Sequence, residues 1–274
     1  MITRTHAPKV IESAEVIPVR PVWRPWVMVE RYLLVNRHAW AVVLAGIVEP
    51  VLYLLAMGMG VGTMVGDVHG PGGRPVAYAA FVAPALLATS AMNGSLTDVT
   101  NTFFFKLRFG RFYDALITTP MRPMDVALGE ILWALLRGGL YAAGFMTVMT
   151  VLGLPRSPWF LAAFPAVLLT GWAFAAVGLA VTTYFTSWQQ LEYIVLATLP
   201  MFFFSTTFYP IDVYPDPLAA VVRCTPLYQS VELLRGLSLG DVGAGLLGNV
   251  CYLALMGAVG LVVAHRRMDR LLCR

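Results

Sequence analysis

The stretch MDVALGEILWALLRGGLYAAGFMTVMTVLGLPRSPWFLAAFPAVLLTGWAFAAVGLAVTTY, from Met124 to Tyr184, contains two long apolar runs. The first run extends from Met124 to Leu152 and the second from Trp159 to Tyr184, and only GLPRSP separates them. A helix needs about 20 mostly apolar residues to cross a hydrocarbon core about 30 Å thick. Both runs are long enough, so the stretch predicts a tight hairpin of two transmembrane helices.

The rest of the chain continues this pattern. Of the 274 residues, 58% are hydrophobic and only 12% are charged, about half the charged share of a typical soluble domain. The runs are too long and too continuously apolar for the alternating strands of about ten residues in a membrane barrel. We therefore predict an all-α membrane protein with six transmembrane helices. The other four predicted spans are Trp40 to Gly62, Val76 to Leu96, Leu191 to Tyr209, and Val242 to Ala264.

The distribution of positive charge predicts the orientation. Fourteen of the 19 lysine and arginine residues precede the first span, lie between the second and third spans, or follow the last span. Four lie on the opposite side, and Arg137 lies inside a span. Because cytoplasmic loops carry the excess of Lys and Arg, we expect both termini in the cytoplasm. The net charge of +4 then reflects orientation and anionic lipid headgroups, and implies no nucleic-acid partner.

The chain divides into four parts by composition. Residues 1–22 lack the apolar run of a signal peptide and are predicted to be a flexible cytoplasmic N-terminus. Residues 23–39 have one broad apolar face, which predicts an amphipathic helix in the membrane interface; a cytoplasmic extension of the first span is the alternative. The six-span domain covers residues 40–264, and residues 265–274 form a basic cytoplasmic tail.

Motifs for catalysis or metal binding are missing from the sequence. A phosphate-binding loop needs a lysine after glycine, but neither Lys9 nor Lys106 follows one. No HExxH motif or GxSxG elbow is present, and Cys224, Cys251 and Cys273 have no metal-ligand spacing. We therefore expect a non-catalytic chain that binds no metal and hydrolyses no ATP by itself, with its cysteines as packing residues.

Three charged residues lie within the predicted spans and away from their first two residues: Glu49, which is followed by Pro50, Glu130 and Arg137. An unpaired charge at mid-membrane costs about 2.5–3.5 kcal/mol, so Arg137 should have an acidic partner, either Glu49 or Glu130. The pair could fix helix packing or take part in substrate passage. Arg137 could instead reach the interface by snorkelling.

Two further features concern helix packing and the outer side. Gly58 and Gly62 are spaced for close helix packing. The proline-rich segment from Pro210 to Asp241 contains two short apolar runs, 218–223 and 230–237. These predict half-helices that re-enter the outer leaflet, with a plain surface loop as the alternative. Glu232 and Arg235 are placed to pair one turn apart.

The segments YDALITTPMRPMDVALGEILWALLRG, FFFSTTFYP and PLYQSVELLRG, together with the six spans, resemble the ABC-2 family of ABC-exporter permeases. The likeness extends from about Trp23 to the end of the chain. Within the family the chain is most similar to the branch of nodulation-factor and antibiotic-resistance permeases.

This resemblance implies partners and a coupling site. Such permeases work with a separate ATPase subunit, which binds ATP and Mg and grips a short cytoplasmic coupling helix between the second and third spans. By position, that helix is Phe112, Tyr113, Asp114, Ala115, Leu116 and Ile117. Its apolar residues could fill a cleft, and the surrounding arginines could steer docking. A basic loop held at the lipid headgroups is the alternative reading of this segment.

The predicted function is therefore the permease subunit of an ATP-driven exporter in the inner membrane. Two identical or related permease chains would pair, with two ATPase subunits, and move an amphiphilic substrate such as a drug, lipid or lipid-linked oligosaccharide. A stand-alone secondary transporter or channel, with Glu49, Glu130 and Arg137 as an ion relay, is the alternative. A membrane scaffold without transport is a third possibility.

Overall fold

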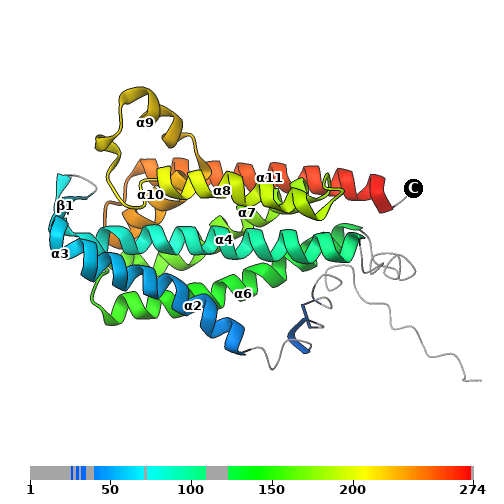
Figure 1. The fold of residues 1–274 in the computed structure, drawn as a ribbon, viewed down its shortest axis with the longest axis horizontal. Coiled ribbons are helices and arrows are strands. Elements are labelled where there is room, and N and C mark those ends of the chain that lie inside the picture. Colours follow the sequence, from blue (N-terminus) through cyan, green and yellow to red (C-terminus); the bar gives the residue numbers. More distant parts are fainter. Residues whose placement is uncertain are drawn as a thin grey trace, which may run out of the picture.

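The computed structural model describes residues 26, 29, 30, 32–34, 40–70, 73–108 and 123–272, and this part is nearly all helical (Figure 1). In chain order its elements are α2 (Trp40–Leu55), the π-helix η2 (Ala56–Val61), α3 (Gly62–Val65), β1 (Asp67–His69), β2 (Pro75–Ala77), α4 (Tyr78–Arg108), α6 (Pro123–Val151), η4 (Pro158–Ala162), α7 (Ala163–Thr182), η5 (Trp188–Leu191), α8 (Glu192–Phe204), η6 (Ile211–Val213), α9 (Asp216–Arg223), α10 (Pro226–Leu239) and α11 (Ala244–Leu272).

Five helical segments in the described residues are long and apolar enough to cross a membrane. They correspond to the predicted first, second, third, fourth and sixth spans. Their bounds are Leu44–Val65, Tyr78–Lys106, Asp125–Val151, Pro158–Thr182 and Ala244–Arg270.

The predicted fifth span, Leu191 to Tyr209, is wrong at its C-terminal end. Helix α8 has 13 residues and ends at Phe204, so it is about 20 Å long at 1.5 Å per residue. The next residues form hydrogen bonds with their own neighbours. The Ser205 and Thr207 hydroxyls share a hydrogen bond of 2.8 Å, and Thr206 Oγ1 donates to the Ser205 carbonyl at 2.6 Å. Such local bonds compete with the helix ladder, and Thr206 adopts a φ of 59°.

Helices α4 and α11 continue well past the predicted ends of their spans. Helix α4 reaches Arg108, twelve residues beyond Leu96, so Lys106 belongs to a helix and not to a loop. Residues 265–272, predicted as a basic tail, continue α11. The apolar run shows which residues can lie in lipid, but charged residues such as Lys and Arg are good helix formers and prolong the helix beyond it.

Helix α7 is the centre of the bundle, packed against α4, α6 and α11. Its contact with α11 is close because Gly260 has no side chain: a Cβ there would lie 2.8 Å from the Val177 nitrogen. Small residues that let helix backbones approach are typical of membrane helix interfaces. Gly58 and Gly62 also face a neighbour, since their added Cβ atoms would meet Ala79 and Tyr78 at the start of α4.

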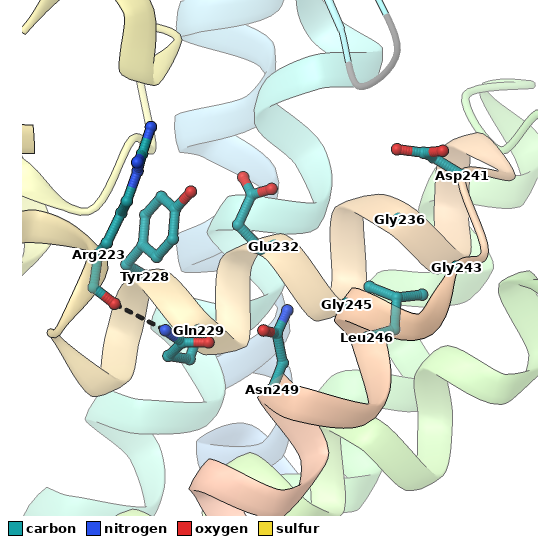
Figure 2. A pocket seen from close by; sticks show the side chains of 10 residues that line it. All are labelled: Arg223, Tyr228, Gln229, Glu232, Gly236, Asp241, Gly243, Gly245, Leu246 and Asn249. Carbon is teal, nitrogen blue, oxygen red and sulfur yellow. Dashed lines mark hydrogen bonds between the residues drawn. The ribbon is translucent and has the colours of Figure 1, made fainter. Parts of the chain in front are cut away.

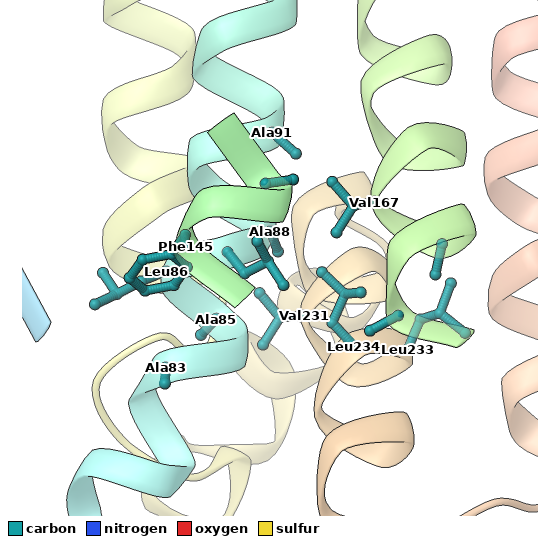
Figure 3. Packing of buried hydrophobic residues seen from close by; sticks show 14 of the residues in the cluster. Ala83, Ala85, Leu86, Ala88, Ala91, Phe145, Val167, Val231, Leu233 and Leu234 are labelled. Atoms are coloured by element: carbon teal, nitrogen blue, oxygen red, sulfur yellow. The ribbon is translucent and has the colours of Figure 1, made fainter. Parts of the chain in front are cut away.

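The core continues between α4, α6 and α10 (Figure 3). Alanines on α4, among them Ala85 and Ala88, lie beside Phe145 of α6 and Leu234 of α10, and all four are fully buried. The two short apolar runs lie in the helices α9 and α10, and α10 is longer than its run; their re-entry into the outer leaflet stays a prediction. Because α10 is packed into the core, it closes one end of the bundle, next to the β1–β2 hairpin, which pairs Asp67 with Ala77.

Candidate functional site

Arg137 pairs with an acid that the sequence analysis did not single out. Arg137 Nη2 donates to Asp98 Oδ1, so the predicted partners Glu49 and Glu130 are both wrong. The pair joins α6 to α4, and the side chains are 29% and 16% exposed. Arg137 Nε has no acceptor among the described residues. Asp98 was missed because the second span was predicted to end two residues before it.

Glu130 belongs to a different cluster, closer to the start of α6. Lys106 Nζ, on α4, lies 2.9 and 3.2 Å from the two carboxylate oxygens of Glu130. The hydroxyl of Tyr32 donates to Glu130 Oε1 at 2.7 Å, and its ring lies 5.3 Å from that of Trp133. Glu130 is buried, so the N-terminal segment is tied to the bundle by a charge-assisted hydrogen bond.

Glu49 lines a pocket on one face of the bundle. The pocket has a volume of about 350 Å³ and is bounded by α2, α4, α6 and α8. Its polar lining consists of Glu49, Tyr53, Thr89, Ser90, Asn93 and Tyr141, and its apolar lining includes Leu86, Leu199, Phe202 and Phe203. Glu49 and Asn93 are exposed in the single chain. A carboxylate on the exposed face of an apolar helix is costly in lipid and marks a functional position.

Tyr141 connects this pocket to the ion pair. Its ring forms part of the pocket wall, and the Arg137 guanidinium carbon lies 5.7 Å from the ring centroid. Asp98 follows the pocket residue Gly94 by one helical turn. The polar groups of α2, α4 and α6 therefore form a continuous polar face within a bundle that is otherwise apolar.

Another arginine, Arg235, is buried at the closed end of the bundle. Arg235 is 2% exposed and donates to Glu232 Oε1 at 3.0 Å and to the Thr206 carbonyl at 2.7 Å. Its guanidinium carbon lies 3.8 Å above the Phe81 ring. The predicted pairing between Glu232 and Arg235 is thus present. The contacts of Arg235 with Phe81 and Thr206 fasten α10 to α4 and to the turn after α8.

Two predicted segments lie wholly or partly outside the described residues. The predicted coupling helix, 112–117, lies there entirely. Of the predicted interfacial helix, 23–39, the described residues are helical, and Val29 is buried. Among the residues that the structure describes, no group of three or more His, Cys, Asp or Glu side chains could hold a metal ion.

The structure combines apolar helices of spanning length, ion pairs between them and a polar pocket beside the Asp98–Arg137 pair. This combination is typical of a multi-pass membrane protein of the transport class. Residues 25–239 match the family model described as ABC-2 type transporter. The chain therefore belongs to the ABC-2 type transporter family, as its motifs predicted.

Three proteins illustrate what the chain is similar to. Nodulation protein J of Rhizobium leguminosarum bv. viciae is 32% identical over 254 residues, covering 91% of this chain and 94% of the relative. Nodulation protein J of R. leguminosarum bv. trifolii is 34% identical over 252 residues, covering 89% and 94%. The inner membrane transport permease YadH of Escherichia coli K12 is 22% identical over 200 residues, covering 72% and 74%.

Proposed function

We propose that the chain is the membrane subunit of an ATP-driven exporter for an amphiphilic substrate, with the polar face around Glu49 as its half of the substrate path. The observation that carries this proposal is the pocket between α2, α4, α6 and α8, which combines a carboxylate, an amide and tyrosines with apolar walls. Such a lining suits a molecule with both polar and apolar parts. The Asp98–Arg137 pair forms the continuation of the path toward the start of α6.

A second permease chain would complete the path. Glu49 and Asn93 are exposed in the single chain. None of the residues of α8 is buried either. The free energy of placing the Glu49 carboxylate in lipid is unfavourable. A second copy of the chain facing it would instead enclose both pockets in one polar cavity.

Helix α8 is too short to cross alone, so η5 before it and the buried turn after it would have to complete a sixth crossing. Six crossings would place both termini in the cytoplasm of the cell and the permease in its inner membrane.

The coupling segment would transmit the work of ATP hydrolysis. The family membership supports an ATPase partner, and the apolar residues of 112–117 suit a cleft in that partner. Leu116→Asp places a charge where the cleft must close. Because burying an unpaired charge costs several kcal/mol, co-purification of the ATPase and transport should both be lost, while expression and monodispersity stay at the parent level.

Arg74→Ala, on the opposite side of the bundle, is the matched control and should leave both properties intact. Full ATPase association and full transport with Leu116→Asp would instead assign the segment to the lipid headgroups.

The alternative of a secondary transporter needs Glu49, Glu130 and Arg137 to act as one ion relay. The structure pairs Arg137 with Asp98 and Glu130 with Lys106, so Glu130 belongs to a separate cluster and the three groups do not form one relay. Family membership also favours the ATP-driven function over this alternative.

A further inference from the structure

Two apolar grooves run along α7, away from the face around Glu49. The α8 groove has a volume of about 290 Å³ and lies mainly between α7 and α8. The α11 groove has a volume of about 430 Å³ and lies between α7 and α11. Apart from Tyr193, Thr198 and Tyr252, the residues that line the two grooves are apolar. Neither groove shares a residue with the pocket around Glu49.

Two of the three hydroxyl groups in these walls already have partners within the protein. Thr198 donates its hydroxyl to the Val195 carbonyl at 3.2 Å, and Tyr252 donates to the Cys224 carbonyl at 2.8 Å. A ligand in either groove therefore contacts mainly hydrocarbon. Both grooves suit an acyl chain, because burying apolar surface is favourable and needs no hydrogen bonds.

The α11 groove is about as long as one leaflet of the membrane. Its lining extends along α11 from Tyr252 to Val263, which is about 16 Å at 1.5 Å per residue. Half of a hydrocarbon core about 30 Å thick is about 15 Å. The first turns of α11 instead line a polar pocket, where Figure 2 shows Asn249 near Glu232 of α10. The groove thus begins where the polar lining of α11 ends.

The two grooves meet along α7. Val177 of α7 and Met256 of α11 line both of them. A molecule with two hydrocarbon chains side by side can therefore place one chain in each groove. Two such chains distinguish a diacyl phospholipid from an amphiphile with a single chain.

Two arginines continue the face of α11 that lines its groove. Arg267 and Arg270 follow Val263 by four and seven residues, so all three share one helix face. The Arg267 guanidinium carbon lies 4.2 Å from the centroid of the Tyr184 ring, just after the end of α7. In the part of the chain that the structure describes, Arg267 has no ion-pair partner and its Nε has no acceptor. The end of the groove can therefore receive an anion.

The acid closest in sequence does not neutralise this end. Asp269 lies 3.4 Å from His265 Nδ1 through its Oδ2 atom, and it is two residues from Arg267, a spacing at which helical side chains do not face each other. Tyr184 and Trp188, which follow α7, are both exposed. Tyrosine and tryptophan are enriched at membrane–water interfaces, so this end of the groove is at the depth of the lipid headgroups.

We propose that this surface binds an anionic diacyl phospholipid, with one chain in each groove and its phosphate on Arg267 and Arg270. Arginine donates charge-assisted hydrogen bonds to phosphate oxygens, and basic sites between membrane helices bind anionic headgroups. In the proposed orientation the lipid belongs to the cytoplasmic leaflet. It is a resident lipid that fills the space between α7 and α8, and not the exported substrate, whose proposed path is the face around Glu49.

The test is the affinity of the purified, delipidated permease for its first bound lipid, measured by native mass spectrometry in detergent. The probes are dioleoyl phosphatidylglycerol, dioleoyl phosphatidylcholine and the single-chain lysophosphatidylglycerol. Phosphatidylglycerol should bind at least about fivefold more tightly than phosphatidylcholine, the factor that one basic residue contributes near an anionic surface. Lysophosphatidylglycerol should bind more weakly than phosphatidylglycerol, because it leaves one groove empty.

Adjacent arginines separate a specific site from a diffuse positive surface. Arg267→Gln should remove most of the preference for phosphatidylglycerol. Arg266→Gln loses the same charge at the neighbouring exposed position and should retain the preference. An equal loss in the two variants, or equal affinity of the parent for both diacyl lipids, overturns the proposal.

Two valines of α11 provide a matched pair for the groove itself. Val259 lines the α11 groove and Val262 does not, and they are 54% and 48% exposed. Val259→Trp should weaken the binding of both diacyl lipids on the order of tenfold, equivalent to excluding about two methylene groups. Val262→Trp should bind them like the parent.

Unchanged lipid affinity of Val259→Trp overturns the proposal, and a loss of paired permease chains in that variant would assign the groove to a second copy. Because the measurement involves neither ATPase nor transport, failure here is distinguishable from failure of the proposed function.

Discussion

Arg137 and Arg235, which both contact acidic side chains inside the bundle, differ in how fully their hydrogen-bonding groups are satisfied. Arg235, at the closed end, is 2% exposed and contacts a carboxylate, a backbone carbonyl and an aromatic ring. Arg137, in the middle of α6, has one carboxylate partner, is 29% exposed and keeps an Nε without an acceptor in the described part of the chain.

We expect this difference to separate a charge that fixes the structure, Arg235, from one that takes part in function, Arg137. A fully satisfied buried charge fixes one geometry, and Arg235 holds three elements in a single arrangement. A charge with spare donors beside a polar pocket can exchange partners or bind a ligand at little cost. The four variants below test that division, in order of their expected effect on stability.

Arg235→Ala should have the largest effect. Removing one partner of a buried ion pair costs about 3–5 kcal/mol, and here the Thr206 carbonyl and Glu232 would also lose their donor. Folded yield and the midpoint of thermal unfolding, followed by size-exclusion chromatography, should fall sharply. Arg223→Ala, twelve residues earlier and exposed, is the control and should unfold like the parent. Equal stability of the two variants would make Arg235 no more structural than a surface charge.

Arg137→Ala should cost less, about 1.5–3 kcal/mol, the range for a hydrogen bond to a charged group. Arg137→Lys should retain more folded protein, because it still offers Asp98 a cation. A double-mutant cycle of Asp98→Asn and Arg137→Gln should give a coupling free energy above about 0.5 kcal/mol. If Arg137→Ala were as abundant and as heat-stable as the parent, the ion pair would not contribute to the fold.

Tyr32→Phe should destabilise the protein by about 1 kcal/mol, since the hydroxyl that donates to Glu130 and accepts from Lys106 is removed while the Lys106–Glu130 pair persists. Limited proteolysis of the N-terminal segment should also become faster. Tyr193→Phe, at a tyrosine that is 63% exposed, should change neither property. A loss of stability as large as that of Arg235→Ala would place this cluster with the structural charges.

Glu49→Gln should leave stability unchanged, because the carboxylate lines an open pocket and has no structural contact among the described residues. Transport should nevertheless fall by about tenfold, equivalent to about 1.4 kcal/mol of barrier. Glu192→Gln, at another exposed acid, should transport normally. Normal transport by Glu49→Gln would remove the pocket from the substrate path.

The sequence predicted the bundle well because length and hydropathy decide which segments can cross a membrane. Five of the six predicted spans correspond to helices of sufficient length. The helix ends were less predictable: a charged helix that leaves the bilayer, as at Lys106, looks like a loop in a hydropathy pattern. The β1–β2 hairpin was missed, since its three-residue strands are too short to give a periodic signal.

The site was predicted less completely, for a related reason. Charges inside the predicted spans pointed to Glu49, Glu130 and Arg137, but partner choice depends on helix rotation and depth. Ending the second span at Leu96 removed Asp98 from consideration, although NGSLTDVTN, Asn93 to Asn101, is unusually polar for a helix of this bundle. The local pair of Glu232 and Arg235 was predictable because helix geometry alone brings such residues together.

The turn after α8 also has a consequence for the order of synthesis. Thr206 is a β-branched residue with a φ of 59°. This conformation costs about 1–3 kcal/mol and persists only where the surrounding structure holds it. The Thr206 carbonyl is held by Arg235, which is 29 residues further along the chain. At about 5–20 residues per second, the ribosome delivers that arginine roughly 1.5–6 s after Thr206. We therefore expect the turn after α8 to adopt its final conformation only after α10 has been synthesised.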